Sequence, residues 1–327
     1  MTVHETTGVQ VLPSSAPHDD GENDAILIGL AQSPRQLPFH LFYDDAGSEL
    51  FRQITETDEY YLTRTEQQIL QQYRHDILTA CGRQRVWIEP GAGSCEKAAR
   101  LLSSSHVAAY VAIDIAAGPL QQAATMLRAA HPAIPIHLLV GDFREAIPQL
   151  DALLPTGKRT IFYPGSSIGN FAPEDAVAWL QQLAHLAGQG GNLLIGFDVP
   201  KSSALLHAAY NDAAGITAAF HLNMLHHLRR RGFQLDPDAF AHSAHYNAAE
   251  HRIEMQLRVL HDTAVRWLNS TVALSAGETI LTEYSYKYPV PMFRDLAERA
   301  GWRYRCHWQD ERAWFAVALF ERCERTA

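Results

Sequence analysis

The feature that most constrains this fold is a short apolar run that ends in a Gly-x-Gly loop. Residues 86–88 are Val, Trp and Ile, Glu89 and Pro90 follow, and Gly91 and Gly93 come directly before a segment of helical character. Glycine allows positive φ and close approach of the backbone to a ligand, and the first N–H groups of the next helix can bind that ligand. The pattern predicts a β-strand, a nucleotide-cradling loop and a helix.

The residue that follows the loop narrows the choice of ligand. A dinucleotide-binding loop has a third Gly or Ala three residues after the second glycine, which admits pyrophosphate against the helix. Glu96 occupies that position here, and its carboxylate would repel pyrophosphate. The loop therefore suits a nucleoside without phosphates, such as S-adenosylmethionine, better than NAD. A purely structural turn in an α/β protein stays an alternative for this loop taken alone.

Polar side chains at the ends of further apolar segments support a nucleoside site. The second segment ends in Asp114, about twenty residues after the glycines, where a doubly wound sheet places a carboxylate for the ribose hydroxyls. The third ends with Asp142 and Phe143, which could hold the amino edge and the face of an adenine. The fourth is followed by Asn170, at a position where acceptors meet the cofactor. A lone Asp can instead cap a helix, but this order of residues indicates a nucleoside-binding α/β sheet.

Composition limits the remaining classes of function. The chain has 327 residues, of which 47% are hydrophobic and 19% charged, so it can bury a sizeable core. Its net charge of −9 argues against nucleic acid as a partner. No apolar stretch is long enough for a membrane span, and the four cysteines and scattered histidines show no metal-ligand spacing. We therefore expect no nucleic-acid partner, no membrane partner, no metal and a monomer.

The pattern along the chain indicates two domains preceded by a tail. Residues 1–24 are polar and acidic and lack the segments of a signal peptide, which predicts a disordered tail on a cytoplasmic protein. The alternation of strands and helices from about residue 86 to 197 predicts an α/β domain built from residues 63–197 and 289–327. An insertion with a different pattern, 198–288, would join residues 25–62 in an α+β substrate-binding domain.

Individual elements are predicted within this division. We expect helices over 95–103, 118–130, 173–186 and 291–299, and a nearly continuous helix over 202–231 that is interrupted around Gly215. Alternating residues predict strands over 244–260 and 265–274. Residues 302–307 and 314–321 predict a closing antiparallel hairpin at the edge of the sheet.

One pair of polar residues in the inserted segment could recognise a substrate ring. Glu283 and Ser285 alternate along an apolar segment, so on a strand both would face the same side. A carboxylate and a hydroxyl on one face could bind an N–H-bearing ring such as imidazole. The alternative, which the residues alone favour slightly, is an exposed Glu283 paired with Lys287.

Several blocks of sequence together resemble a known enzyme family. The most specific block covers Tyr43 to Phe51 and continues through residues 54–66; the others are residues 89–97, 165–170, 210–212, 252–255 and 283–288. The combination resembles the histidine Nα-methyltransferases of the ergothioneine pathway and spans about residue 27 to residue 320. The resemblance implies a Rossmann-like methyltransferase sheet and a second, substrate-binding domain formed by the N-terminal region and an insertion.

The resemblance also implies a reaction. S-adenosyl-L-methionine would be the methyl donor and S-adenosylhomocysteine its product, and the α-amino group of L-histidine would be trimethylated to hercynine, the first step of ergothioneine biosynthesis. The implied cofactor-binding residues are Gly91, Gly93, Lys97, Asp114, Asp142 and Phe143, with Lys97 at the carboxylate of the cofactor.

The substrate would be held at three points according to the same resemblance. Asn170 and Tyr210 would bind its carboxylate, and Glu283 and Ser285 the imidazole edge, which makes Glu283 a specificity residue rather than a surface one. The other implied contacts are Tyr43 and Gly165 near the amino group, Tyr60 beside the imidazole and Met255 along the ring, with Tyr43, Gly165 and Asn170 as the catalytic group. Other hypotheses stay open: an N-methyltransferase for another aromatic amino acid such as tryptophan, a nicotinamide oxidoreductase, and a non-catalytic binding module.

Overall fold

The computed structural model describes residues 9–11, 19–115, 117–141, 150 and 153–323. By contacts within the chain, these residues divide into two compact units. Unit 1 holds the described residues of Met1–Ala16, Leu62–Val199 and Tyr288–Ala327, and unit 2 those of Pro17–Tyr61 and Pro200–Lys287. Each unit is therefore assembled from segments far apart in the sequence.

Unit 1 is built on an eight-stranded sheet of order β1-β5-β4-β3-β6-β7-β14-β13. The strands β1 to β7 of this sheet run parallel, and β14 and β13 add an antiparallel pair beside β7. The expected C-terminal hairpin at the sheet edge is thus confirmed. The strands are β1 (Val9–Val11), β3 (Arg85–Pro90), β4 (Val107–Asp114), β5 (Ile136–Val140), β6 (Arg159–Tyr163), β7 (Asn192–Asp198), β13 (Trp302–Gln309) and β14 (Phe315–Arg322).

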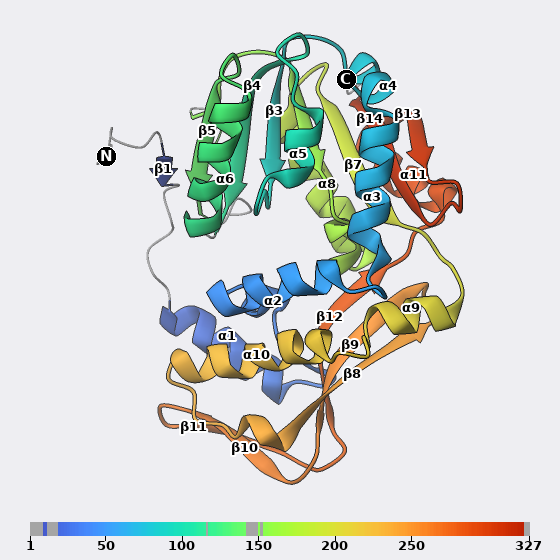
Figure 1. The fold of residues 1–327 in the computed structure, drawn as a ribbon. Helices are drawn as coiled ribbons and strands as arrows, with labels where there is room; N and C mark the ends of the chain where they lie inside the picture. Colours follow the sequence, from blue (N-terminus) through green and yellow to red (C-terminus); the bar gives the residue numbers. More distant parts are fainter. Residues whose placement is uncertain (1–8, 12–18, 116, 142–149, 151–152, 324–327) are drawn as a thin grey trace. The chain divides into compact units, whose positions relative to one another are not determined.

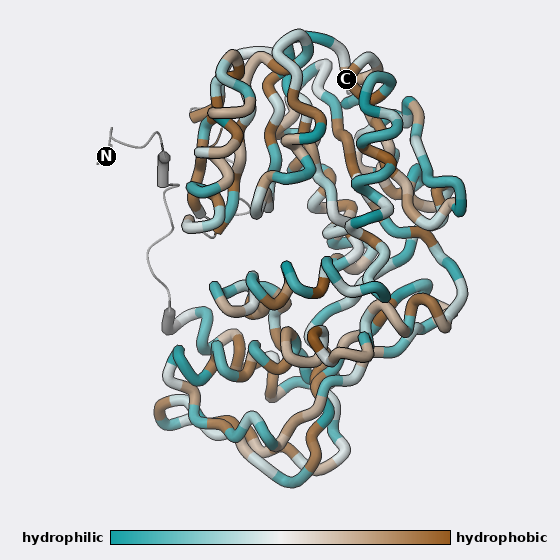
Figure 2. Tube along the Cα trace, viewed as in Figure 1, coloured by the Kyte–Doolittle hydropathy of each residue, from teal (hydrophilic) through white to brown (hydrophobic). Residues whose placement is uncertain are grey.

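The middle of this sheet is the core of unit 1. Every residue of β3 and of β7 is buried, as expected for parallel strands that are covered on both faces. These strands carry mostly hydrophobic residues, drawn in brown in Figure 2. Helices flank the sheet, and α5 and α6 lie in front of it in Figure 1. The helices are α3 (Tyr61–Gln72), α4 (Arg74–Cys81), α5 (Glu96–Leu101), α6 (Ala117–Ala130), α8 (Pro173–Ala187) and α11 (Val290–Arg299).

Unit 2 combines a four-stranded sheet of order β2-β12-β9-β8 with helices from both of its segments. The short β2 (Arg35–Gln36) pairs parallel with β12 (Thr279–Tyr286), and β12, β9 (Arg252–Val259) and β8 (Phe240–Asn247) are antiparallel neighbours. Helix α10 (Ile216–Arg230) contacts α2 (Asp45–Glu56) and β8. The remaining helices are α1 (Asp19–Ala31) and α9 (Ser203–Ala209).

The structure differs from the sequence-based expectation in three places. Within the expected disordered tail, Val9–Val11 form a strand beside β5, and helix α1 begins at Asp19. The segment 244–260 contains a turn and forms parts of two strands, β8 and β9. The segment 265–274 is likewise a hairpin of β10 (Thr263–Trp267) and β11 (Ser270–Leu274). The expected break in the helix at Gly215 is confirmed, since this residue has φ of 72° and begins α10.

Candidate functional site

The Gly-x-Gly loop of unit 1 follows β3 and bends back against the end of β4. Gly91 and Gly93 have φ of 71° and 50°. The N–H groups of Gly91 and Ala92 both donate to the carbonyl of Ile113, at 2.8 and 3.1 Å. A Cβ atom on Gly93 would meet no other atom within 4 Å, so the residue is glycine for its backbone conformation and its open surroundings, not because of packing.

Asp114 stands at the end of β4 beside this loop. One oxygen of its carboxylate accepts a hydrogen bond from the N–H of Gly93 at 2.8 Å. The bond fixes the carboxylate next to the glycines, which is the position a ribose-binding acid requires in a doubly wound sheet. The structure therefore brings together three of the predicted cofactor residues. Two others, Asp142 and Phe143, lie outside the described residues.

A buried acid lies beneath the same loop. Glu89 is 2% exposed and accepts a hydrogen bond from the hydroxyl of Tyr110 on β4. Burial raises the pKa of Glu89 to about 8, although the Tyr110 bond and the charge of Lys97 act in the opposite direction. Burial also raises the pKa of Cys95, the residue before α5, to about 12. The loop thus rests on side chains that are uncharged at neutral pH.

Lys97, the predicted partner of the cofactor carboxylate, is engaged by a residue that sequence reasoning did not single out. Its Nζ atom lies 2.7 Å from the carboxylate of Glu66, on α3. The same carboxylate accepts the N–H of Gly165, at 2.9 and 3.0 Å to its two oxygens. Lys97 and Gly165, which are 68 positions apart in the sequence, therefore share one buried acid. Glu66 lies in a sequence block that resembles the family, but that block gave no hint of its role.

Gly165 and Asn170 lie in the turn after β6. Ser166 has φ of 62° there, and its hydroxyl accepts the N–H of Asp198 at 3.0 Å, which ties the turn to the end of β7. Asn170 ends a short 3-10 helix and is half-buried. Among the described residues, its side-chain amide has no hydrogen-bond partner, so the amide can donate to and accept from a ligand.

In unit 2, a hydrogen-bonded triangle joins Tyr210, Ser285 and Lys287. The Tyr210 hydroxyl lies 2.7 Å from Oγ of Ser285, and Nζ of Lys287 donates to both oxygens at 2.8 Å. All three residues are buried. Sequence reasoning left an exposed Glu283 paired with Lys287 as an alternative, but Glu283 is half-buried and the ammonium group of Lys287 donates to Tyr210 and Ser285.

Glu283 stands opposite Met255 in the register of β12 and β9. Among the described residues, its carboxylate forms no hydrogen bond or ion pair. Burial raises the pKa of Glu283 to about 8, while the nearby charge of Lys287 lowers it. A carboxyl group held in this way can accept from, or donate to, a ring nitrogen that replaces the missing partner.

An aromatic cluster extends from Tyr210 through the N-terminal segment of unit 2. The ring centroids of Tyr60 and Tyr210 are 6.3 Å apart, those of Tyr60 and Phe51 6.2 Å, and those of Phe51 and Tyr43 6.1 Å. The contacts are edge-on, a favourable geometry for aromatic pairs. The predicted substrate residues Tyr43, Tyr60 and Tyr210 thus form one cluster with Ser285, although they come from distant parts of the sequence.

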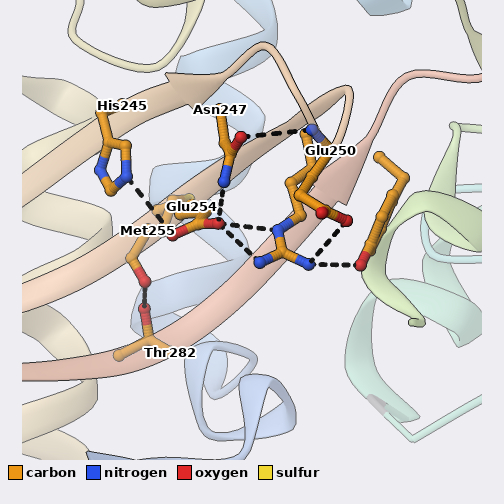
Figure 3. Close-up of polar contacts among 8 residues, drawn as sticks. His245, Asn247, Glu250, Glu254, Met255 and Thr282 are labelled. Atoms are coloured by element: carbon orange, nitrogen blue, oxygen red, sulfur yellow. Dashed lines mark hydrogen bonds and ion pairs between the residues drawn. The ribbon is translucent and has the colours of Figure 1, made fainter. Parts of the chain in front are cut away.

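A second group of side chains stabilises the sheet that carries Glu283, and Figure 3 shows its polar contacts. The guanidinium of Arg252 donates to Glu254 at 2.8 Å and to the hydroxyl of Tyr286 at 2.6 Å. It also lies 4.0 Å from the ring centroid of Tyr284. Residues 284 and 286 alternate with 283 and 285 along β12, so this group lies on the opposite face of the strand.

The described residues contain no group of three or more His, Cys, Asp or Glu side chains that could hold a metal ion. Among the helices that the structure describes, none has the length and apolar character needed to cross a membrane.

The strand order, the Gly-x-Gly loop after β3 and the acid at the end of β4 define a Rossmann-like methyltransferase. A family model described as "Histidine-specific methyltransferase, SAM-dependent" matches residues 22–322. The chain belongs to this family, and the resemblance seen in the sequence is confirmed.

Individual relatives agree with the family assignment. The chain is 39% identical to the histidine N-alpha-methyltransferase of Mycolicibacterium smegmatis and 38% identical to that of Mycobacterium tuberculosis. Each alignment covers 89% of this chain and 92% of the relative. The L-tryptophan methyltransferase of Psilocybe serbica is 26% identical, over 97% of this chain and 96% of that protein.

Proposed function

We propose that this protein transfers three methyl groups from S-adenosyl-L-methionine to the α-amino nitrogen of L-histidine, giving hercynine and S-adenosylhomocysteine as the first step of ergothioneine biosynthesis. Membership of the histidine-specific family supports the reaction class. The observation that carries the choice of substrate is the half-buried carboxyl group of Glu283, which forms no hydrogen bond with the described residues and lies on the strand face that also bears Ser285.

Unit 2 supplies groups that match the imidazole end of the substrate. Glu283 and the Ser285 hydroxyl would bind the two ring nitrogens, while Met255 and Tyr60 would contact the ring. A neutral imidazole has one N–H donor and one acceptor nitrogen. The Ser285 oxygen can accept from one ring nitrogen while its own hydrogen goes to Tyr210, which leaves the Tyr210 hydrogen for the substrate carboxylate.

The substrate carboxylate and amine need different partners. The hydroxyl of Tyr210 and the amide of Asn170 would hold the carboxylate, and Tyr43 and Gly165 would lie near the amino group. The contacts to the carboxylate and to the imidazole do not involve the amine protons. Binding of the substrate at these two ends therefore stays the same as methyl groups accumulate. That property is required of an enzyme that methylates one nitrogen three times.

The transfer itself is a displacement that requires position more than chemical assistance. The lone pair of the amine forms the new N–C bond as the C–S bond of S-adenosylmethionine breaks, and the bonding electrons stay on sulfur. The amine must lose one proton before each transfer, so three protons are released to solvent per hercynine. Gly91, Gly93 and Asp114 would bind the nucleoside and Lys97 the carboxylate of the methyl donor.

The reaction is tested by incubating the purified protein with S-adenosylmethionine and, separately, histidine, tryptophan or tyrosine. We expect mass spectrometry to show one, two and three added methyl groups on histidine only. Trimethylation of tryptophan instead would assign the protein the specificity named for its relative in Psilocybe serbica. Binding of S-adenosylhomocysteine without methylation of any amino acid would contradict the proposal.

A further inference from the structure

The carboxylate of Glu66 is enclosed by the protein next to the predicted cofactor residue Lys97. Its side chain is 1% exposed, while the side chain of its partner Lys97 is 21% exposed. A buried carboxylate is stable only if nearby charges and donors replace the water it loses. In Glu66 these are the ammonium group of Lys97 and the backbone N–H of Gly165.

The backbone of β7 leaves room for this carboxylate because residue 196 is a glycine. A Cβ atom on Gly196 of β7 would lie 2.0 Å from Oε1 of Glu66 and 3.0 Å from the ring of Phe315. Any larger residue at 196 would therefore displace the acid. Four parts of unit 1 meet at this carboxylate: helix α3, helix α5, the turn after β6 and strand β7.

The bonds of Glu66 decide what Lys97 and Gly165 can offer to a ligand. The ammonium group of Lys97 has three donors, of which one is directed to Glu66, so two remain for a ligand. The N–H of Gly165 is already satisfied by Glu66, so this N–H is not a donor for substrate. A Cβ at Gly165 would lie 3.1 Å from Nζ of Lys97, and its φ of 91° also favours glycine.

We infer that Glu66 is a positioning residue for methyl-donor binding: it holds the Lys97 ammonium and the turn at Gly165 in one fixed arrangement. The inference rests on the proposed function, in which Lys97 binds the carboxylate of S-adenosylmethionine. Because the side chain of Glu66 is enclosed, it would act through Lys97 and the turn at Gly165 and not by direct contact with a substrate.

The test is the substitution Glu66→Gln. Glutamine keeps the shape and an oxygen for the N–H of Gly165, but its NH₂ group would face the ammonium of Lys97, where both groups are donors. We expect the Kd of S-adenosylhomocysteine, measured by titration calorimetry, and the KM for S-adenosylmethionine to rise at least tenfold. The kcat at saturating methyl donor and the KM for histidine should stay within about threefold, a separation that general loss of structure would not produce.

Asp76→Asn is the matched control, since it removes one exposed negative charge from α4 of the same unit. It should leave the Kd of S-adenosylhomocysteine unchanged. Unchanged or tighter binding in Glu66→Gln would overturn the inference. Wild-type protein that failed to bind S-adenosylhomocysteine would instead overturn the proposed function, so the two failures are distinguishable.

A double variant covers the case in which Glu66→Gln alone does not fold. Lys97→Met leaves the Glu66 charge buried without its partner, and adding Glu66→Gln removes that charge. We expect the double variant to melt at a higher temperature than Lys97→Met and to bind S-adenosylhomocysteine equally weakly, within twofold. A further tenfold loss of binding in the double variant would show that Glu66 acts independently of Lys97 and would overturn the inference.

Discussion

The Nδ1 atoms of His221 and His242 lie 2.6 Å apart in unit 2. Nε2 of His221 is also hydrogen-bonded to the hydroxyl of Thr282, and this hydroxyl donates to the carbonyl of Met255. At the other end, Nε2 of His242 is hydrogen-bonded to the carbonyl of Tyr210. Both carbonyls can only accept, so this chain of four hydrogen bonds requires four hydrogens. With both imidazoles neutral, the hydroxyl and the two rings supply three, so one of the four contacts then lacks a hydrogen.

The histidine pair leads to a prediction about acid stability. Burial lowers the pKa of both rings, and for His242 the charge of His207 lowers it further while Asp212 and the Tyr210 carbonyl raise it. The unfolded chain therefore takes up protons near pH 6.5 that the folded chain does not, and stability falls as the pH drops below about 6.5. We expect the free energy of unfolding, measured by urea titration, to decrease less between pH 7.5 and pH 5.5 in His242→Gln than in the wild type. Equal losses would contradict this.

Glu283→Gln tests the residue assigned to the imidazole. A ring N–H of histidine bonded to Glu283 favours the charged form of the carboxyl group, so loss of this charge-assisted hydrogen bond should cost about 2 kcal/mol, which corresponds to about a 30-fold rise in the KM for histidine. The KM for S-adenosylmethionine should not change, because Glu283 is not among the methyl-donor residues. Glu250→Gln, at an exposed position between β8 and β9, is the control. A KM for histidine within twofold of the wild type would remove Glu283 from the site.

Glu89→Gln should stabilise the protein at alkaline pH. The pKa of Glu89 is about 8 in the folded state and ordinary when unfolded, so the folded state holds the proton more tightly. As the pH rises from about 4.5 to 8, the unfolded chain loses this proton first, and the free energy of unfolding falls by up to about 1.4 kcal/mol per pH unit. Melting temperatures at pH 5 and pH 8.5 should therefore differ less in the variant than in the wild type. A variant that is less stable than the wild type at pH 8.5 would show that the charged form is favoured.

Substitution by alanine should affect the stability of the protein very differently at two helical glycines. A Cβ atom on Gly47 would lie 1.7 Å from the carbonyl oxygen of Phe42, whereas one on Gly118 would meet nothing within 4 Å. Gly47→Ala should cost at least about 3 kcal/mol, because backbone must move. Gly118→Ala should change stability by less than about 1 kcal/mol, because the small gain in helix propensity is opposed by the proline that follows at 119. Chemical denaturation of both variants measures the difference, and similar values for the two would be inconsistent with the structure.

The parallel sheet and its closing hairpin were predictable because their signals are local. Apolar runs with polar ends identify β3, β4 and β5, and the order of those ends identifies the nucleoside loop. The β10–β11 hairpin was missed because its turn has no glycine: Leu268 takes the positive φ of 50° instead, which the sequence pattern disfavours.

The polar partners in the site were less predictable than the fold. One alternative paired Lys287 with Glu283, four positions away, but Lys287 donates to Tyr210, 77 positions away. Nothing in the sequence pattern of α3 distinguishes Glu66 from a surface residue. Only the three-dimensional structure shows that its carboxylate binds Lys97 and the N–H of Gly165. Such contacts depend on the packing of several elements, which periodicity along one element does not reveal.

The interleaving of the two units along the chain has a consequence for synthesis on the ribosome. The strand β2, at Arg35–Gln36, pairs with β12 at Ile280 and Leu281, so the sheet of unit 2 cannot be completed until nearly the whole chain has been made. The sheet of unit 1 likewise waits for β14, which ends at Arg322. The central strands of unit 1 are therefore made before unit 2 can be completed, and unit 1 in turn waits for strands that follow the last segment of unit 2.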